Sequence, residues 1–459
     1  MSVYKSCDIR GPVAALRPEL YQRWGAILGR RVAAGDTFVV GGDVRLSTPE
    51  FKAALSEGLR AAGARVLDLG ILPTPMVYFA KRRLRAAGCA IVTASHNPPQ
   101  INGLKWMIGD LPVTEADVAA LRRDTAAAEP LSPRPPGTLA AGDIAPEYLA
   151  WLQVMPYWHG VHPALHVIID AGNGCWSERA AAYAQAIFPA LRIEAIHDVA
   201  DGRFPHRHAD VARPAYLHRL CAEVVARGAD IGIAFDGDGD RVAFVDDGGH
   251  ALSAEEATWV LLLSCWPGLR DRAFVYDIKF SDRMAEGARV LGGEPHMERS
   301  GHAFIRRRML DEGGIFGAEI SGHYFYGDLD GGDDGLYTAL RMLAHLTHAE
   351  QSLHALRRTC PPIFMTPDLR LPLDAAARRA ALAAVCAAFA DDEQVTIDGI
   401  RIERPGGWAL VRSSVTEPAL TFRFEGHTAD SLHALVRDFC ARVPAVGEAL
   451  WEQYRSPGG

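Results

Sequence analysis

The first third of the chain alternates short apolar runs with longer segments whose apolar residues recur every three or four positions. The runs TFVVGGD (37–43), ARVLDLG (64–70) and CAIVTAS (89–95) predict strands. Residues 49–63 and 75–87 have helical spacing, with Thr48 as the expected N-cap of the first helix. Strands that alternate with helices predict parallel pairing and therefore an α/β domain.

The alternation continues beyond a Pro- and Ala-rich stretch at 124–142, which we interpret as a linker. The strand LHVIID and the turn AGNG (171–174) open a second α/β unit, and a third begins after about residue 248. From about residue 370, two strand-like runs lie between helical segments at 375–390 and 429–442, which indicates a smaller α+β unit. We therefore predict α/β domains at 1–143, 144–247 and 248–364 and an α+β domain at 365–459.

Three segments repeat one pattern: a helix end with an Arg, a Gly expected to end that helix, a short apolar strand and a polar loop. The loops contain Ser95, Asp236–Asp240 and Glu319–His323. Ligands of open α/β sheets bind beyond the carboxyl ends of the strands, so these loops are expected in equivalent positions. The same pattern also occurs in α/β proteins without any repeat.

The segment DGDGDR (236–241) places three carboxylates at alternate positions, where an extended backbone points them the same way. The intervening glycines allow the loop to bend so that the three can converge on one ion, and hard oxygen ligands suit Mg²⁺. An EF-hand is excluded because Arg241 stands where its Gly is needed. The related stretch GDLDGGDDG (327–335) lacks the alternation and is read as a loop with Asp333 or Asp334 capping the next helix.

Composition narrows the function classes. Among 459 residues, 49% are hydrophobic and 23% charged, and the formal net charge of −8 comes without long single-sign runs. These values argue against nucleic acid or an anionic membrane as partner and leave small anions as candidates. Eight scattered cysteines, with no CxxC pair, and an N-terminus without an apolar signal core favour a reducing cytoplasm.

The segment TASHNPPQINGLK (93–105) follows a predicted buried strand and has a serine near its tip. It lacks the GxSxG pattern of a hydrolase nucleophile, and its two prolines stiffen the loop. A rigid hydroxyl near Mg²⁺ suits phosphoryl transfer, where positioning and charge neutralisation do most of the catalysis. This interpretation requires Ser95 Oγ to lie within about 10 Å of the three aspartates.

Four ordered motifs, TASHNPP…NGLK, DGDGDR, GAEISGHYF and RSSVTEP, resemble the α-D-phosphohexomutase superfamily, and most closely its bacterial phosphomannomutase/phosphoglucomutase members. The resemblance covers nearly the whole chain. It implies four domains around a central cleft, three similar α/β domains with mixed sheets and a smaller, rotating C-terminal α+β domain.

The resemblance also implies roles for individual residues. Ser95 would be the phosphoserine, whose oxygen joins Asp236, Asp238 and Asp240 on Mg²⁺, while Arg10, His96, Lys105 and Arg241 would surround the phosphoryl group. Lys105 would be the general base, a role that needs a lowered ammonium pKa. The other implied contacts are with substrate. Lys279 and His302 resemble substrate contacts of the family without a more specific role. Glu319, Ser321 and His323 would bind sugar hydroxyls, and Arg412, Ser414 and Thr416 the phosphate that is not transferred.

The implied activity interconverts hexose 1-phosphate and hexose 6-phosphate, of mannose, glucose or both, through a 1,6-bisphosphate. A phosphoglucosamine mutase is the nearest alternative, although Ile320 stands where it usually has a polar residue. A Mg²⁺-dependent sugar phosphatase and a non-catalytic sugar-phosphate or Ca²⁺-binding protein are further alternatives. Glucose or mannose 1,6-bisphosphate is the implied activator, and a monomer or weak dimer is expected.

The chain departs from the family pattern at several positions. Cys7 stands where a Tyr is usual, and Val415 replaces an Asn of the phosphate loop. The segment FPHRHADVARP (204–214) is more basic than the usual asparagine-rich version. Ser95, the aspartates and Lys105 themselves keep the family pattern.

Overall fold

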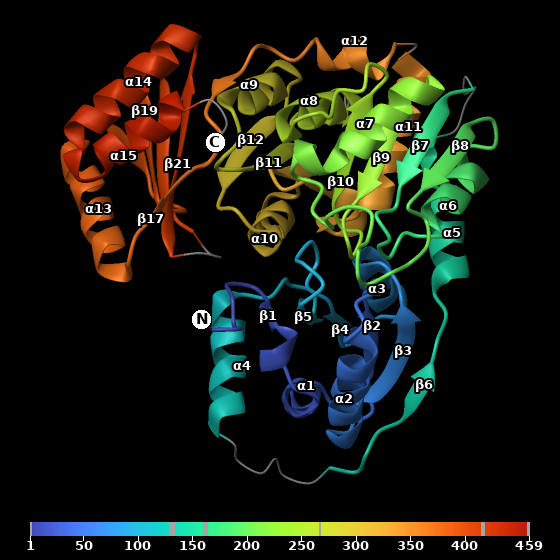
Figure 1. Cartoon of the computed structure of the whole chain (residues 1–459). Helices are drawn as coiled ribbons and strands as arrows, with labels where there is room; N and C mark the ends of the chain where they lie inside the picture. Colours follow the sequence, from blue (N-terminus) through green and yellow to red (C-terminus); the bar gives the residue numbers. More distant parts are fainter. Residues whose placement is uncertain are drawn as a thin grey trace.

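The computed structural model describes residues 2–127, 134–158, 164–265, 268–349, 351–414 and 418–456. Its strands form four separate sheets that follow one another along the chain (Figure 1). In the figure the blue N-terminal domain lies below the green and yellow domains, and the red C-terminal domain lies to one side. The predicted class, three α/β domains and a smaller α+β domain, is confirmed, while the boundaries at 143, 247 and 364 stay predictions.

The first domain has a six-stranded sheet of order β1-β5-β4-β2-β3-β6. Strand β2 pairs in parallel with β3 and β4, and β5 returns antiparallel along β4. The strands are β1 (Ile9–Pro12), β2 (Thr37–Gly42), β3 (Arg65–Ile71), β4 (Gly88–Val92), β5 (Ile101–Ile108) and β6 (Leu139–Ala141). The helices are α1 (Pro18–Arg30), α2 (Thr48–Ala61), α3 (Thr74–Arg83) and α4 (Glu115–Ala127).

The second and third domains have sheets of order β10-β9-β7-β8 and β12-β11-β13-β14-β15. Their strands are β7 (His166–Asp170), β8 (Arg192–Ile196), β9 (Ile231–Phe235), β10 (Val242–Asp246), β11 (Ala273–Asp277), β12 (Glu294–Glu298), β13 (Phe316–Glu319), β14 (His323–Tyr326) and β15 (Gly332–Asp333). Their helices are α5 (Ala145–Gln153), α6 (Ala180–Ile187), α7 (His218–Arg227), α8 (Ala254–Cys265), α9 (Asp282–Val290), α10 (His302–Glu312), α11 (Gly335–Ala349) and α12 (Leu353–Arg357).

These three sheets share one four-stranded core, β5-β4-β2-β3, β10-β9-β7-β8 and β14-β13-β11-β12. In each, a central strand pairs in parallel with a second strand, which in turn pairs antiparallel with the strand that follows it. Ser95, Asp236 and Glu319 lie at or just beyond the ends of that second strand, β4, β9 or β13. The repeat expected from the sequence therefore exists, and it brings the three polar loops to equivalent places.

Local details differ from the sequence predictions at three points. Gly228 and Gly313 end their helices in the left-handed region, but α3 ends near Leu84 and Arg85 adopts the positive φ instead of Gly88. Thr48 is the first residue of α2, and its hydroxyl donates to Asp43 rather than capping the helix. Two elements overlap the linker expected at 124–142. Helix α4 extends to residue 127, because alanine favours helix, and strand β6 pairs with β3.

The fourth domain is an antiparallel sheet with three helices. Its strands are β16 (Phe364–Met365), β17 (Leu369–Pro372), β18 (Glu393–Val395), β19 (Ile400–Arg404), β20 (Gly407–Ser413) and β21 (Ala419–Gly426). Its helices are α13 (Ala375–Ala388), α14 (Ala429–Arg442) and α15 (Pro444–Arg455). All of the pairs between its strands are antiparallel.

The buried apolar residues do not form one separate core for each sheet. One continuous cluster runs from Val39 to Leu356 and joins the first three domains. The fourth domain has its own cluster, between Leu369 and Leu450, and a small group around Trp408 contacts Ile278 of the third domain. In the described part of the chain, no helix is both long and apolar enough to cross a bilayer.

Candidate active site

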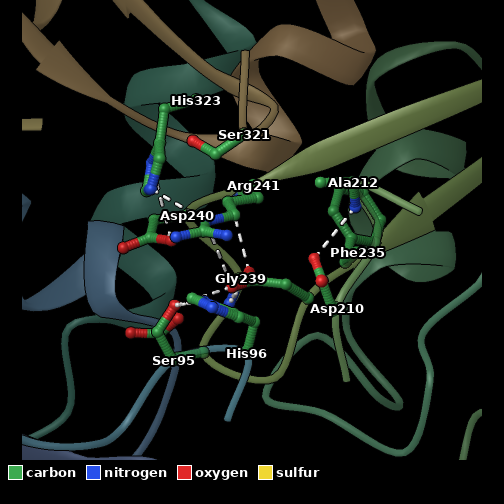
Figure 2. Close-up of polar contacts among 12 residues, drawn as sticks. Ser95, His96, Asp210, Ala212, Phe235, Gly239, Asp240, Arg241, Ser321 and His323 are labelled. Atoms are coloured by element: carbon green, nitrogen blue, oxygen red, sulfur yellow. Dashed lines mark hydrogen bonds and ion pairs between the residues drawn. The ribbon is translucent and has the colours of Figure 1, made fainter. Parts of the chain in front are cut away.

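Ser95 lies where the loops of the first two domains meet (Figure 2). Its side chain is fully buried, and its Oγ donates to Oδ2 of Asp236 at 3.0 Å. The distance is far below the limit that the sequence analysis set. The backbone of Ser95 has φ +53°, a conformation that costs free energy for a residue with a side chain. A hydrogen bond from its amide to Thr93 Oγ1 at 2.8 Å helps to hold that conformation.

Asp236, Asp238 and Asp240 form a buried cluster in which one oxygen of each lies within 4.8 Å of the others. Burial and the two neighbouring carboxylates raise the pKa of Asp236 well above its usual range. Asp238 Oδ1 and Asp240 Oδ1 are buried without a hydrogen-bond partner in the described structure. Buried carboxylate oxygens without partners, in a cluster of three aspartates, fit a hard divalent cation such as Mg²⁺, so the residues present suit the implied metal.

Lys105, on β5, lies directly against this cluster. Its Nζ donates to Asp238 Oδ2 at 2.8 Å and also contacts Asp240 Oδ2. Burial alone would lower the pKa of Lys105, but the two carboxylates outweigh it and hold that pKa well above its usual value. The expected lowering is therefore wrong for this arrangement, because the sequence shows neither the number nor the distance of the carboxylates.

Arg241 connects the aspartate loop to the third domain. Its Nε donates to His323 Nε2 at 2.9 Å, and a backbone bridge pairs the same two residues. His323 Nδ1 in turn contacts Asp333 Oδ2 at 2.5 Å. From the sequence, Asp333 is expected only as a possible helix cap, but Asp334 caps the helix by accepting the amide of Tyr337. The only signal for Asp333 was its place beside a second aspartate before a helix.

His96 and Arg10 lie on the first domain. His96 Nδ1 is 3.3 Å from Ser95 Oγ, and burial together with the Arg241 and Arg10 charges lowers the pKa of His96 well below its usual value. The imidazole is therefore neutral at pH 7. Arg10 Nε donates to Asp8 at 2.8 Å.

Glu319, Ser321 and His302 are the third domain's other predicted contacts. Ser321 Oγ donates to Glu319 Oε1 at 3.0 Å, while Glu319 Oε2 is buried without a partner in the described residues. The His302 ring lies 6.0 Å from that of His323, and burial lowers the pKa of His302. An unpaired carboxylate oxygen is suited to accept a hydroxyl of a sugar.

Arg412, from β20, belongs to a second polar group. It pairs with Asp398 at 2.8 Å, and its Nε is buried without a hydrogen-bond partner in the described structure. Asp398 also accepts the amide of Ser300 at 3.3 Å, and Ser300 Oγ donates to Asp277 Oδ1, whose other oxygen is 3.5 Å from Lys279 Nζ. This chain of contacts places Arg412 and Lys279 in one group.

Ser414 and Thr416 are the other two residues of the predicted phosphate loop. The Ser414 amide donates to the Ala419 carbonyl at 2.9 Å across the base of the loop. Thr416 and the departure Val415 lie outside the described residues.

Cys7 lines a cavity of about 20 Å³ with Lys105 and His302, and burial raises the pKa of its thiol to about 12.

The comparisons with known proteins cover every domain. Models of the phosphoglucomutase/phosphomannomutase family match as alpha/beta/alpha domain I at residues 2–131, domain II at 160–249, domain III at 260–364 and the C-terminal domain at 369–442. A phosphomannomutase/phosphoglucomutase of Pseudomonas aeruginosa is 32% identical over 460 residues, which cover 98% of this chain and 97% of that protein.

Solved structures agree with this match. A phosphoglucomutase/phosphomannomutase family protein of Burkholderia thailandensis superposes with a TM-score of 0.85 at 32% identity and covers 100% of this chain and 98% of its own. The N-acetylphosphoglucosamine mutase of Aspergillus fumigatus, solved with GlcNAc-6P and magnesium, has a TM-score of 0.61 at 12% identity, with coverage of 98% and 96%. At that identity the second likeness concerns the fold alone.

Proposed function

The chain belongs to the phosphoglucomutase/phosphomannomutase family, and from this premise we propose that it interconverts hexose 1-phosphates and hexose 6-phosphates. Mannose, glucose or both are the proposed sugars, and Ser95 carries the transferable phosphoryl group. The observation that carries the proposal is the 3.0 Å contact between Ser95 Oγ and Asp236, beside two buried carboxylate oxygens without partners.

The aspartate loop and its neighbours make that serine suitable for phosphoryl transfer. Mg²⁺, held by Asp236, Asp238 and Asp240, would offset the charge of a phosphoryl group and polarise its phosphorus. Arg241 and Lys105 supply further positive charge at the same place, and both are buried, where a charge acts more strongly than in water. Transfer from Ser95 to the sugar hydroxyl breaks the Ser95 O–P bond and forms an O–P bond to the sugar.

The accepting hydroxyl must lose its proton during transfer, and two groups are candidates for handling it. The imidazole of His96 lies 3.3 Å from Ser95 Oγ, but its lowered pKa makes it a weak base. Lys105 holds its own proton while Asp238 and Asp240 contact it, so it stabilises charge in that state. It can act as the general base only after those contacts weaken.

The remaining groups bind the substrate. Glu319 offers its unpaired oxygen to sugar hydroxyls, with Ser321 and His323 beside it. We assign Arg412, with Ser414 and Thr416, to the phosphate that stays on the sugar, because an arginine can bind it with two parallel hydrogen bonds. A 1,6-bisphosphate that turns over between the two transfers would present either phosphate to Arg412 and return the other to Ser95.

The test uses Ser95→Ala and, as a matched control, Ser56→Ala, which removes another buried serine hydroxyl of the same domain. We expect no turnover of mannose or glucose 1-phosphate in the first variant and wild-type turnover in the second. Turnover by Ser95→Ala at the wild-type rate would reject the proposal. Parallel assays with glucosamine phosphate distinguish a phosphoglucosamine mutase.

A phosphatase is distinguished by its products. It would release inorganic phosphate continuously and need no activator, whereas the mutase should respond to glucose or mannose 1,6-bisphosphate. Since all eight cysteines are free thiols, we also propose a reducing compartment, the cytoplasm. A monomer or weak dimer is the working unit that we propose, and gel filtration would test it.

A further inference from the structure

Two buried arginines lie behind the serine and aspartate loops. Each pairs with an aspartate at the end of the central strand of its domain, Asp43 after β2 and Asp170 at the end of β7. Arg45 Nε is 2.9 Å from Asp43 Oδ2, and Arg207 Nε is 2.8 Å from Asp170 Oδ2. All four side chains are at most 2% exposed, so neither pair is a surface ion pair.

Arg45 holds the backbone of the serine loop. Its guanidinium donates to four carbonyl oxygens at 2.6 to 2.9 Å, those of Ser95, Asn97, Pro98 and Ile101. One rigid side chain therefore joins both ends of the loop to the strand that carries Asp43.

Arg207 makes the equivalent contacts behind the aspartate loop. It donates to the Phe235 carbonyl at 2.7 Å, to the Asp170 carbonyl at 3.2 Å and to the His208 carbonyl at 3.0 Å. Phe235 is the residue directly before Asp236. Gly172 leaves the space for this guanidinium, because a Cβ there would lie 2.4 Å from it. Arg207 belongs to the unusually basic segment 204–214 of the sequence.

The two arrangements touch each other. The ring of Phe204, three residues before Arg207, lies 5.2 Å from the Arg45 guanidinium carbon. A Cβ at Gly237 would lie 2.7 Å from the Ser95 carbonyl and 3.3 Å from the Phe204 ring, so the two loops pack closely there. Figure 2 shows the two loops meeting, with Ser95 and His96 close to Gly239 and Asp240.

From this geometry we propose that Asp170–Arg207 is a positioning pair that sets the three aspartates for a divalent cation, and that Asp43–Arg45 sets Ser95. The proposal rests on the proposed function. Like charges drive Asp236, Asp238 and Asp240 apart, so a loop that brings them together needs a rigid support. Arginine suits this part because its planar guanidinium holds five N–H donors in a fixed fork, whereas the three N–H donors of lysine all diverge from one nitrogen.

The test compares Arg207→Met and Arg207→Lys with the control Arg203→Met. Arg203 lies in the same segment and also pairs with an aspartate, Asp201, but its side chain is 73% exposed. Mn²⁺ binding, followed by the electron paramagnetic resonance signal of the free ion, gives a readout that needs no turnover. Residues that orient metal ligands typically change metal affinity about 10- to 100-fold.

We expect Mn²⁺ affinity to fall about 10- to 100-fold in Arg207→Met and by a smaller factor in Arg207→Lys, which keeps the ion pair with Asp170. Arg203→Met should bind Mn²⁺ as the wild type does. If Arg207→Met does not fold, the same comparison is made with Arg207→Lys. Wild-type Mn²⁺ affinity in a folded Arg207 variant would overturn the proposal, even if its thermal stability fell.

Arg45→Lys should show the opposite pattern. We expect Mn²⁺ affinity close to that of the wild type, but phosphorylation of Ser95 by the 1,6-bisphosphate about 10- to 100-fold slower. Equal losses of both properties in the Arg45 and Arg207 variants would contradict separate positioning. If the wild type binds Mn²⁺ yet turns over no hexose phosphate, the proposed function fails, while the metal-binding arm of this inference is still decided by Arg207.

Discussion

The surroundings of Ser95 and of Arg412 are built in opposite ways. Asp238, beside Ser95, accepts hydrogen bonds from Thr74, Thr93 and Lys105 of the first domain at 2.8 to 3.2 Å, and one apolar core joins the first three domains. Arg412 belongs to a domain with its own core, and Asp398 is the residue that it pairs with.

The contacts between the fourth domain and the third also differ from the continuous apolar packing that joins the first three domains. They include the small Trp408 cluster and several polar contacts, such as Arg401 with the Ile278 carbonyl and Glu425 with the Asp282 amide. Domains joined mainly by polar contacts are expected to move relative to each other. Under the proposed function, the region joined by one core, here called the fused region, would hold the reacting atoms, and the fourth domain would bind the phosphate that stays on the sugar.

The largest expected effect tests the fused region. Asp240→Asn removes one of three converging carboxylate charges, so kcat should fall about 10³-fold or more while KM changes much less. Asp247→Asn, an exposed position at the far end of β10, is the control. Steady-state kinetics with glucose 1-phosphate measures both constants. A kcat near that of the wild type would show that Asp240 does not take part in phosphoryl transfer.

The next largest effect concerns the fourth domain. Arg412→Met removes charged hydrogen bonds to a phosphate that does not react, so KM should rise about 10- to 100-fold with a smaller change in kcat. Arg442→Met, which removes a partly exposed arginine of the same domain, should leave both constants unchanged. A large loss of kcat at constant KM would mean that Arg412 acts on the transferred group.

Asp334 gives a third prediction, on the stability of the fused region. It accepts hydrogen bonds from Tyr148 of α5 and from the Tyr337 amide, and burial raises its pKa to about 7. The folded state therefore keeps a proton that the unfolded chain releases near pH 4, and stability falls as the pH rises from about 4 to about 7.

Asp334→Asn should lose that dependence. Between pH 5 and pH 7 the wild type should lose up to about 2 kcal/mol more unfolding free energy than the variant does. Urea unfolding at several pH values measures the difference. Parallel curves for the two proteins would show that Asp334 ionises normally.

The smallest expected effect concerns Asp398, the partner of Arg412. The Asp398 carboxylate pairs with the Arg412 guanidinium at 2.8 Å, so under the proposed function it would compete with a substrate phosphate for that guanidinium. Asp398→Asn should therefore lower KM about two- to fivefold without changing kcat. An increase in KM would show instead that Asp398 orients Arg412 for binding.

Much of the fold followed from local patterns. The helix predicted at 429–442 is observed at those residues, because Thr428 and Ser431 form a capping box at its start. The proximity of Ser95 to the aspartates followed from their equivalent places after strands. Such features depend on a few neighbouring residues and on the general geometry of α/β sheets.

The supporting residues could not be predicted in this way. Arg45 and Ser95 are fifty positions apart in the sequence. Nothing in the sequence distinguishes a buried arginine such as Arg45 from an exposed arginine in a loop. The sign of the Lys105 pKa change likewise depends on which charges lie within a few ångströms of Nζ. The positive φ of Arg85 shows that a glycine nearby does not decide where a helix ends.

The most direct measurement of the central claim is the mass of the protein and of its peptides after incubation with glucose 1,6-bisphosphate. The account predicts that the wild type gains one phosphoryl group, located on Ser95, and that Ser95→Ala gains none. The account would be contradicted by an active wild type that carries its phosphoryl group on another residue, or that never carries one.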